Sequence, residues 1–378
     1  MPPISLLIKP ASGNCNLRCK YCFYHSLAEN RAVPSYGVMQ PGTLEAVVRN
    51  ALEYADEVCT FAFQGGEPTL AGLDFFQQLI GFVHLYNTKK VKVNYALQTN
   101  GLLIDEPWAE FLHRHRFLVG ISLDGTKEIH DLMRLDIHGK GTYQRVLKTT
   151  VLFDRYGVDY NILCVINTYI ARSIRKVYGA FKKHGFRYLQ FIPCLDPLGE
   201  APGGYEHSLT PERYAMCLKN LFDLWYQDLI KGERVSIRYF ENLVGMLMGY
   251  PPESCGMSGE CQTAFVIEGD GGVYPCDFYV FDEWHMGNVS DSSFFELKKS
   301  EASCRFTRLS QYVDPKCGKC KWFKLCRGGC RREREPFMGN LPALNRFCGS
   351  YEEFFSYSYE RLLQLGRMFS ANNGGINI

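Results

Sequence analysis

The stretch that decides the fold is Cys15-Asn16-Leu17-Arg18-Cys19-Lys20-Tyr21-Cys22, near the start of a chain of 378 residues. It places three thiols at spacings of four and then three. Three soft ligands from one short segment suit an iron–sulfur cluster better than a structural zinc ion, which takes four ligands in a closed tetrahedron. A four-iron cluster held by three thiolates keeps one iron open to an outside ligand. From these residues alone, a chance group of cysteines or a zinc knuckle is the alternative.

Predicted strands precede this motif and a second one. Residues 5–9 read as a buried strand, and the cysteine segment follows at its carboxyl end, where parallel α/β barrels gather their chemistry. Residues 59–63 form another predicted strand, which runs straight into Gln64-Gly65-Gly66-Glu67-Pro68. The Gly-Gly pair lets backbone groups approach a ligand closely. An ordinary turn between a strand and a helix has the same composition.

Together, the C-x3-C-x2-C segment and the Gly-Gly-Glu-Pro segment one βα unit later resemble the radical S-adenosylmethionine (SAM) enzymes. The resemblance implies that the amine and carboxylate of SAM chelate the open iron of a cluster bound by Cys15, Cys19 and Cys22. It also implies that the second segment binds the methionyl amine, with Gln64 and Glu67 among the cofactor-binding residues.

Strands and helices continue to alternate along the first half of the chain. The predicted strands are residues 5–9, 59–63, 91–97, 117–123, 159–166 and 188–193. The predicted helices between them are residues 42–56, 75–86, 108–115, 143–155 and 172–184. Six such units favour an α/β fold in which a parallel sheet curves into a partial barrel. A partial (β/α)6 TIM-like barrel of the radical SAM type is also what the resemblance implies.

Polar residues recur where these strands end, at Gln64, Gln98, Ser122, Asn167 and Gln190. Each one is either a turn cap or a ligand contact, and their shared position on one rim favours ligand contacts. By resemblance, the positions that match SAM contacts are Tyr21, Gly66, Ser122, Arg134 and Leu195. Arg134 is expected to pair with the SAM carboxylate, with an ordinary surface charge as the alternative.

The last third of the chain is rich in cysteine. Nine of the sixteen cysteines lie between Cys255 and Cys348. No export signal precedes them, so we expect reduced thiols that act as metal ligands or reactive groups. The spacing Cys317-x2-Cys320-x5-Cys326-x3-Cys330, followed by Cys348, resembles the SPASM extension of radical SAM enzymes that modify peptides.

Eight of these thiols suffice for two four-iron clusters with four ligands each. The resemblance implies that one cluster is held by Cys255, Cys261, Cys276 and Cys330, and the other by Cys317, Cys320, Cys326 and Cys348. Full ligation favours electron transfer over a second SAM site, and paired structural zinc sites are the alternative. We expect the remaining thiols to be buried and structural: Cys59, Cys164, Cys194, Cys217 and Cys304.

Shorter patterns give further predictions. Thr210 and Pro211 are typical of a helix start and predict a helix to residue 229. Residues 235–240 read as extended, with Arg238, Tyr239 and Phe240 either lining a peptide groove or packing in a core. Residues 265–274 predict a hairpin with Gly271 at a positive φ. The run from Arg331 to Glu335 reads as a solvated face.

These patterns predict four ranges: a radical SAM partial barrel at residues 1–200, a connecting segment at 201–252, a SPASM auxiliary-cluster domain at 253–349, and a C-terminal helix and tail at 350–378. The formal net charge is +2 at pH 7, which gives no electrostatic footprint for nucleic acid or a membrane surface. No run of eighteen apolar residues exists in the sequence. We therefore expect a cytoplasmic monomer.

Over essentially its whole length the sequence resembles the anaerobic sulfatase-maturating enzymes, with the cysteine type favoured. The resemblance implies three [4Fe-4S] clusters and SAM as cofactors, an external flavodoxin- or ferredoxin-type electron donor, and a sulfatase substrate with a Cys-x-Pro-x-Arg-like motif. The product would be Cα-formylglycine, made from a cysteine or a serine through a 5′-deoxyadenosyl radical. Asp277, directly after Cys276, matches the family's catalytic base; capping of the cluster loop is the alternative.

Two other functions stay open at this point. One is a radical SAM enzyme that forms thioethers in a ribosomal peptide or epimerises it. Such enzymes often carry an N-terminal leader-binding domain, and we expect none here because Cys15 comes so early. The other is a non-enzymatic iron–sulfur or zinc protein, which the two motifs and the six βα units disfavour.

Overall fold

The computed structural model describes residues 3–337 and 341–371. The chain divides into two compact units. The first contains residues 3–123, 130–160 and 262–306, and the second contains residues 124–129, 161–261 and 307 onward. The units interleave in sequence, so they do not follow the four predicted ranges one by one, and those motif-based boundaries stay a prediction.

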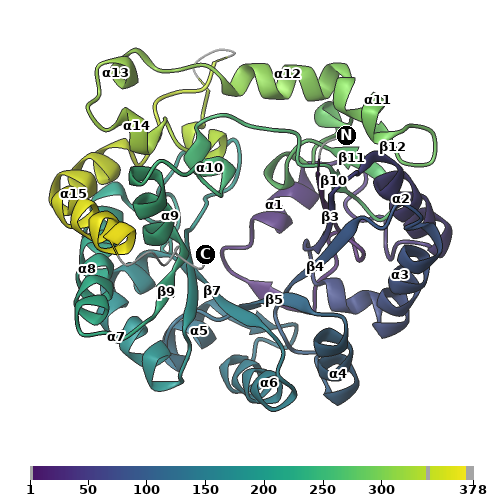
Figure 1. Cartoon of the computed structure of the whole chain (residues 1–378), viewed down its shortest axis with the longest axis horizontal. Coiled ribbons are helices and arrows are strands. Elements are labelled where there is room, and N and C mark those ends of the chain that lie inside the picture. Colours follow the sequence, from purple (N-terminus) through teal and green to yellow (C-terminus); the bar gives the residue numbers. More distant parts are fainter. Residues whose placement is uncertain (1–2, 338–340, 372–378) are drawn as a thin grey trace. The chain divides into compact units, whose positions relative to one another are not determined.

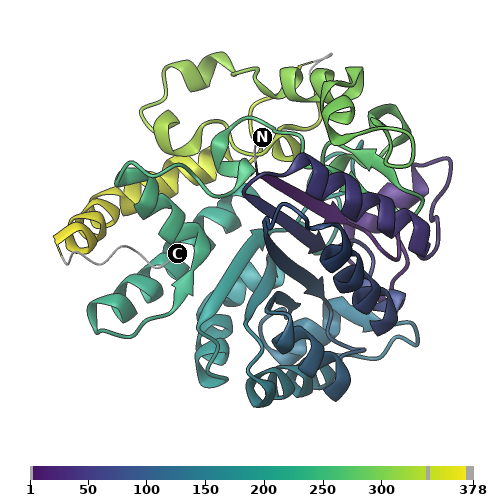
Figure 2. The same cartoon turned by 45° about the vertical axis from the view of Figure 1, so that its right-hand side comes forward.

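The first unit is built on parallel strands covered by helices. In sheet order the strands are β1 (Ile4–Ile8), β3 (Val58–Phe63), β4 (Lys92–Thr99) and β5 (Phe117–Ser122). The helices that alternate with them are α2 (Pro41–Tyr54), α3 (Leu73–Tyr86), α4 (Glu106–Arg114) and α6 (Tyr143–Tyr156). In Figures 1 and 2, α2 and α3 lie together on one face of these strands. The predicted alternation of strands and helices is confirmed, and the ends of these elements differ from the predicted ends by at most two residues.

A hairpin from the cysteine-rich third extends the same sheet. Strand β10 (Val266–Ile267) lies parallel to β1, with Leu7 opposite Val266. Strands β11 (Gly272–Tyr274) and β12 (Gly287–Asn288) follow in antiparallel order. Gly271 has φ +88° at the turn, so the predicted hairpin and its glycine are confirmed. This pairing brings the segment after β11 to the N-terminal strand.

Several shorter elements accompany these strands and helices. Strands β2 (Leu17–Cys19) and β6 (Arg134–Asp136) form a separate antiparallel pair. The short helices are α1 (Phe23–Glu29), α5 (Lys127–Met133), η1 (Pro68–Ala71), η2 (Asp277–Tyr279), η3 (Asp282–Trp284), α11 (Phe294–Lys299) and α12 (Glu301–Ser310). Of these, α1, β2, β6 and η2 carry residues of the candidate site.

The second unit combines parallel strands with long helices. Its strands are β7 (Tyr160–Ile166), β8 (Tyr188–Pro193) and β9 (Ser236–Ile237). Its helices are α7 (Thr168–Lys183), α8 (Pro211–Ile230), α9 (Arg238–Leu247), α10 (Cys255–Ser258), α13 (Pro315–Gly318), α14 (Phe323–Cys326), η4 (Arg331–Arg334) and α15 (Cys348–Ala371). Figure 1 shows α15 beside α8, where Arg361 pairs with Asp223 at 2.8 Å. Thr210 caps α8 as predicted, by accepting a hydrogen bond from the Arg213 backbone.

The prediction that residues 235–240 are extended is wrong from Arg238 onward. Strand β9 ends at Ile237 and helix α9 begins at Arg238. Phe240 is fully buried and packs on Phe222 and Trp225. Core packing therefore explains Phe240, whereas the peptide-groove interpretation of Arg238 and Tyr239 stays a prediction.

The solvated face predicted at Arg331–Glu335 is also wrong, because residues 331–334 are each less than a tenth exposed. Arg334 donates to the backbone carbonyls of Gly259, Ser310 and Tyr312. Arg332 donates to the Asp196 carbonyl. These carbonyls lie in loops and at helix ends, where no regular backbone partner is available, so guanidinium groups satisfy them. The charged run is therefore buried, and its arginines connect loops and helix ends of the second unit by hydrogen bonds.

All sixteen cysteines lie within the described residues, and none of them is in a disulfide bond. Cys59, Cys164, Cys194 and Cys217 are buried as predicted, and Cys304 is exposed. The prediction for Cys304 is wrong because its position on α12 faces solvent.

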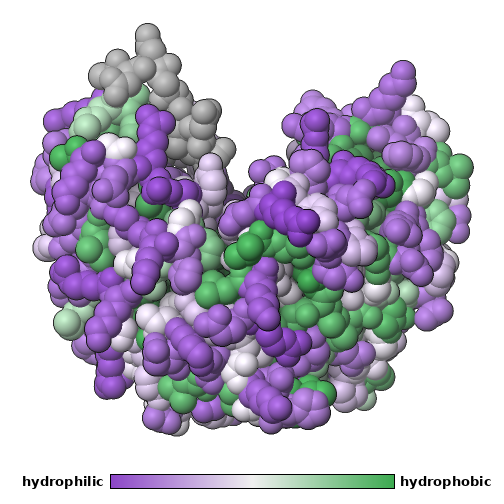
Figure 3. Space-filling view, turned by 90° about the horizontal axis from the view of Figure 1, so that it is seen from below, coloured by the Kyte–Doolittle hydropathy of each residue, from purple (hydrophilic) through white to green (hydrophobic). Residues whose placement is uncertain are grey.

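The molecular surface is mixed. In the part of the chain that the structure describes, no helix is both long enough and apolar enough to cross a bilayer. The face drawn in Figure 3 carries mostly hydrophilic side chains, with smaller hydrophobic areas between them.

Candidate active site and cluster-binding cysteines

The three N-terminal cysteines lie on and beside β2. Burial raises the pKa of Cys15 to about 11, and burial also raises the pKa of Cys22. The Cys15 sulfur accepts a hydrogen bond from the Leu17 backbone at 3.4 Å, and the Asn100 amide lies 3.8 Å from it. Thiols of this kind lose their protons when they bind a metal. Three half-buried thiols on one short segment fit a cluster with one open iron.

Arg134 lies directly opposite Cys19 in the β2–β6 pair. Its guanidinium nitrogen is 3.9 Å from the Cys19 sulfur, and the group sits 5.4 Å from the centre of the Tyr21 ring. Only 7% of Arg134 is exposed, so it is not an ordinary surface charge. Two of the predicted SAM-binding residues, Tyr21 and Arg134, are therefore brought together beside the cysteines.

The Gly-Gly-Glu-Pro segment is tied to the cysteine segment through its backbone. The Glu67 amide donates to the Asn14 carbonyl at 2.8 Å. Gly66 has φ +54°, and a Cβ atom there would lie 2.2 Å from that same carbonyl oxygen. Only glycine allows this approach. The structure thus places the two sequence motifs in contact.

The Glu67 side chain is fully engaged inside the protein. Its Oε1 accepts from Thr69 and from Thr99, and its Oε2 accepts from the Asn100 backbone at 2.7 Å. Burial raises its pKa. This carboxylate fixes the segment against the end of β4, and its predicted contact with SAM stays a prediction.

The other predicted rim residues have different partners. The Gln98 amide donates to the Ser122 hydroxyl at 3.1 Å, at the ends of β4 and β5. Asn167 accepts from the backbones of Tyr169 and Ile170 at the start of α7, so the turn-cap interpretation holds there. Leu195 belongs to the second unit, in the loop after β8.

Asp277 is the centre of a hydrogen-bonded group in the first unit. Its Oδ2 accepts from the Tyr24 hydroxyl at 2.5 Å and from the Gln64 amide at 3.3 Å. Its Oδ1 is buried and has no hydrogen-bond partner among the described residues. Burial raises the pKa of Asp277, and the nearby Lys9 charge opposes that rise. A carboxylate with one anchored and one unpartnered oxygen is suited to accept a proton from a ligand.

A buried charge group lies behind Tyr24. The ammonium of Lys9 pairs with Glu268 at 2.8 Å and lies 5.0 Å from the centre of the Tyr24 ring. Arg31 also pairs with Glu268 at 2.8 Å, and Ser12 donates to the same carboxylate at 2.6 Å. Burial by itself raises the pKa of Glu268, but the charges of Lys9 and Arg31 outweigh this effect and lower that pKa to about 2.

Sequence reasoning missed Tyr24, Lys9 and Glu268. Tyr24 follows Cys22 by two residues, which was the one available signal. Lys9 and Glu268 are 259 positions apart in the sequence, and the parallel pairing of β1 with β10 brings them together. No local pattern predicts that contact.

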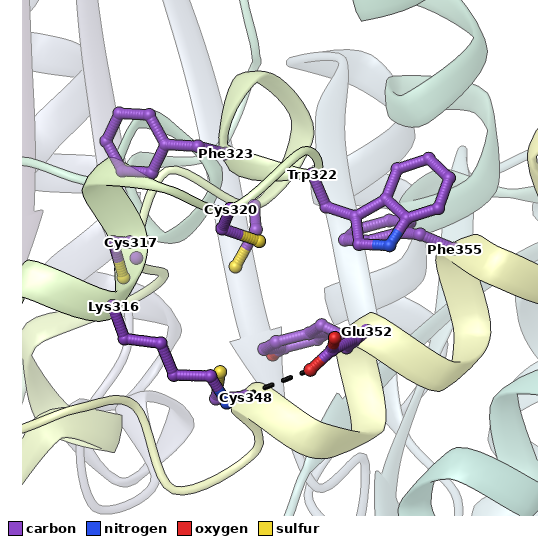
Figure 4. Close-up of a pocket in the computed structure, with 11 residues that line it drawn as sticks. Lys316, Cys317, Cys320, Trp322, Phe323, Cys348, Glu352 and Phe355 are labelled. Atoms are coloured by element: carbon purple, nitrogen blue, oxygen red, sulfur yellow. Dashed lines mark ion pairs between the residues drawn. The ribbon is translucent and has the colours of Figure 1, made fainter.

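Four of the predicted cluster ligands surround one cavity in the second unit (Figure 4). Cys317, Cys320, Cys326 and Cys348 line one cavity, together with aromatic residues that include Trp322. The Trp322 indole nitrogen is buried and has no partner among the described residues. Four thiols and a spare N–H donor fit a sulfur-rich guest such as an iron–sulfur cluster.

The other predicted auxiliary ligands are divided between the units. Cys255, Cys261 and Cys330 belong to the second unit, and Cys276 belongs to the first. Burial, together with the charges of Glu333 and Cys255, raises the pKa of Cys330. A Cβ atom at Gly256, next to Cys255, would lie 3.6 Å from the Cys330 Cβ. In the described residues, no three His, Cys, Asp or Glu side chains converge tightly enough to hold a single metal ion.

Comparisons with known proteins agree with these features. Residues 10–178 match the Radical SAM superfamily, and residues 255–321 match the iron-sulfur cluster-binding domain SPASM. The chain is 52% identical to the cysteine-type anaerobic sulfatase-maturating enzyme of Clostridium perfringens, over 97% of this chain and 99% of the relative. It is 49% identical to the enzyme of the same name from Clostridium novyi, over 97% and 98%.

A solved structure of native anSMEcpe with bound AdoMet and Cp18Cys peptide superposes with a TM-score of 0.94 at 50% identity, covering 97% of this chain and 100% of that one. These matches confirm the predicted partial barrel of the radical SAM type with a C-terminal SPASM region. They also confirm S-adenosylmethionine and iron–sulfur clusters as the cofactors. The chain therefore belongs to the family of cysteine-type anaerobic sulfatase-maturating enzymes, within the radical SAM superfamily.

Proposed function

We propose that this protein oxidises a cysteine of a sulfatase polypeptide to Cα-formylglycine, in a motif of the Cys-x-Pro-x-Arg type. The observation that carries the proposal is the state of Asp277, whose Oδ1 has no hydrogen-bond partner among the residues that the structure describes while Tyr24 and Gln64 hold its Oδ2. Family membership and the peptide bound in the solved relative support a peptide substrate.

Asp277 is the proposed base for the target thiol. The reaction removes a hydrogen from the cysteine β-carbon, a proton from the sulfur and one further electron; hydrolysis of the thioaldehyde then gives the aldehyde. A carboxyl group of ordinary pKa, about 3.9, is a poor acceptor for a proton from a thiol of pKa about 8.5. Each unit by which burial raises the Asp277 pKa lowers the cost of that transfer by about 1.4 kcal/mol.

The residues around Cys15, Cys19 and Cys22 are proposed to hold the cofactor. When bound there, SAM and its cluster supply the 5′-deoxyadenosyl radical. Arg134 offers a buried cation for the SAM carboxylate, beside the Tyr21 ring. Gly66 keeps its segment against Asn14, which leaves the backbone of the Gly-Gly turn available to the methionyl amine. Ser122 and Leu195 are the further proposed contacts.

The C-terminal cysteines are proposed to hold two fully ligated [4Fe-4S] clusters. Cys317, Cys320, Cys326 and Cys348 are the proposed ligands of one, which the shared cavity supports. Cys255, Cys261, Cys276 and Cys330 are the proposed ligands of the other. Iron analysis after anaerobic reconstitution is expected to give about twelve irons per chain, four for each cluster.

The cellular setting is also a proposal. The sixteen cysteines, none of them in a disulfide bond, support a reducing compartment, and we infer the cytoplasm. The enzyme is expected to act as a monomer that receives electrons from a flavodoxin- or ferredoxin-type donor.

The test is incubation of the reconstituted enzyme with SAM, a reductant and a peptide that carries the Cys-x-Pro-x-Arg motif, read by mass spectrometry. The expected product has lost sulfur and gained the aldehyde oxygen. A crosslinked or epimerised peptide would instead identify a different peptide maturase. A peptide in which serine replaces the target cysteine tests the cysteine preference in the same assay.

A further inference from the structure

The cavity that holds Cys317, Cys320, Cys326 and Cys348 lies under a strongly basic stretch of chain. Residues 314–327 contain four lysines and one arginine against a single carboxylate, Asp314, whereas the whole chain has 42 cations and 40 anions. All four lysines are exposed: Lys316, Lys319, Lys321 and Lys324. We call these four residues the lysine surface.

Protein carboxylates leave most of this charge unbalanced. Lys316 pairs with Glu352 at 3.7 Å, and both side chains are about half exposed, so the pair is weak. Asp314 caps the start of α13 through the Lys316 backbone. Lys319, Lys321 and Lys324 form no ion pair with any residue that the structure describes.

The lysine surface is immediately next to the thiols. Each of Lys316, Lys319 and Lys321 adjoins Cys317 or Cys320 in sequence. In Figure 4, Lys316 reaches along the cavity toward Cys348. Cys317, Cys320 and Cys348 are themselves only half-buried. A redox group bound by these thiols would therefore sit near the protein surface, beside Lys316 and within a stretch of chain that carries three further exposed lysines.

We propose that the lysine surface is the docking site of an acidic one-electron carrier protein, containing a flavin or an iron–sulfur cluster; this inference rests on the proposed ligand set of the second auxiliary cluster. One electron leaves that cluster for the carrier's cofactor in each turnover, and no proton or group moves across the interface. Redox encounters of this kind use small, polar interfaces. Complementary charge steers the approach of the carrier and speeds association.

The proposal is tested by the binding of the reconstituted holoenzyme to a purified acidic flavodoxin, measured by calorimetry at 50 and 200 mM salt. The affinity is expected to fall with salt. The double variant Lys319→Glu/Lys324→Glu is expected to raise Kd at least tenfold, because neither side chain makes a contact that the fold needs. The matched control is Lys298→Glu/Lys299→Glu, two exposed lysines on α11, which should leave Kd within twofold.

A second measurement separates docking from chemistry. In stopped-flow experiments the double variant should reduce oxidised flavodoxin more slowly, while its iron content and its dye-driven formation of formylglycine match the wild type. Equal weakening by both double variants, or no weakening by either, overturns the proposal. So does displacement of flavodoxin by single-stranded DNA at equal anion concentration, which would mark a general polyanion surface. Failure of the wild type to form formylglycine would instead reject the proposed function.

Discussion

Tyr24 and Asp277 are 253 positions apart in sequence, and the Tyr24 hydroxyl donates a 2.5 Å hydrogen bond to the Asp277 carboxylate. Helix α1 carries the tyrosine, and η2 carries the aspartate directly after the β10–β11 hairpin. The contact joins the two cysteine-rich parts of the sequence. The second carboxylate oxygen has no hydrogen-bond partner in the described part of the chain.

Replacing Asp277 by Asn should remove the proposed base and little else. Formation of formylglycine is expected to fall at least 100-fold, as is typical for loss of a general base. Iron content and uncoupled SAM cleavage should stay near wild type. Asp282→Asn, at an exposed carboxylate on the next short helix, is the control and should keep full product formation. Undiminished product from Asp277→Asn would contradict the assignment.

Replacing Tyr24 by Phe should change the pH dependence. The hydrogen bond from Tyr24 favours the ionised carboxylate and so lowers the pKa of Asp277. Without it that pKa rises further, and because a base must be deprotonated, the acid limb of the rate profile should move to higher pH. Tyr86→Phe removes a comparable bond to Glu45 on the surface and should leave the profile in place. If the acid limb of the pH–rate profile does not move in the Tyr24→Phe variant, ionisation of Asp277 does not determine that limb.

Replacing Glu268 by Gln should destabilise the first unit. Loss of one partner from a buried ion pair costs about 3–5 kcal/mol, or about 5 °C in Tm for a chain of this size. The Glu268 pKa falls from 4.5 unfolded to about 2 folded, so its contribution is complete above pH 4.5 and is lost as the pH falls toward 2. The Tm difference between wild type and variant should therefore narrow below pH 4.5.

The control for this prediction is Glu301→Gln, an exposed carboxylate at the start of α12. It should change Tm by less than about 1 °C, as is usual for a surface substitution. Equal Tm values for the Glu268→Gln variant and the wild type at pH 7 would show that the buried charges are not needed for stability.

Replacing Gly66 by Ala should loosen the SAM site selectively. The added methyl group would lie 2.2 Å from the Asn14 carbonyl oxygen, at a φ that alanine avoids. SAM affinity is expected to fall at least tenfold by equilibrium binding, while the irons of the C-terminal clusters are retained. Gly42→Ala, on α2 with open space around it, should bind SAM normally. Normal affinity in the Gly66→Ala variant would mean that the turn can relax.

Much of the fold could be predicted because its signals are local. Strand β8 begins and ends at the predicted residues, and Thr210 caps α8 through contacts within four positions. Both cysteine motifs could also be recognised in the sequence, because each is defined by the spacing of its cysteines along the chain. The contact between Gly66 and Asn14 could only be expected from the resemblance, because 52 positions separate them.

The misreadings have a shared cause, which is that burial is decided by distant partners. The run at Arg331–Glu335 has the composition of a solvated face. Arg334 is buried nonetheless, because its guanidinium group donates to backbone carbonyls that are distant in sequence, among them that of Gly259. Arg238 and Phe240 follow a short strand, and the packing of Phe240 on α8 favours a helix instead. Lys9 ends a strand that reads as buried, and the partner that balances its charge there, Glu268, lies 259 positions away in the sequence.

The parallel pairing of β1 with β10 affects how this protein can be made. During synthesis on the ribosome, β1 emerges early and then waits for some 260 further residues before Val266 can join it. Until then its outer backbone groups are open to pairing with neighbouring nascent chains. A shortened version that stops before the hairpin would keep the SAM motif but not a sealed sheet, and it should accumulate as insoluble aggregate.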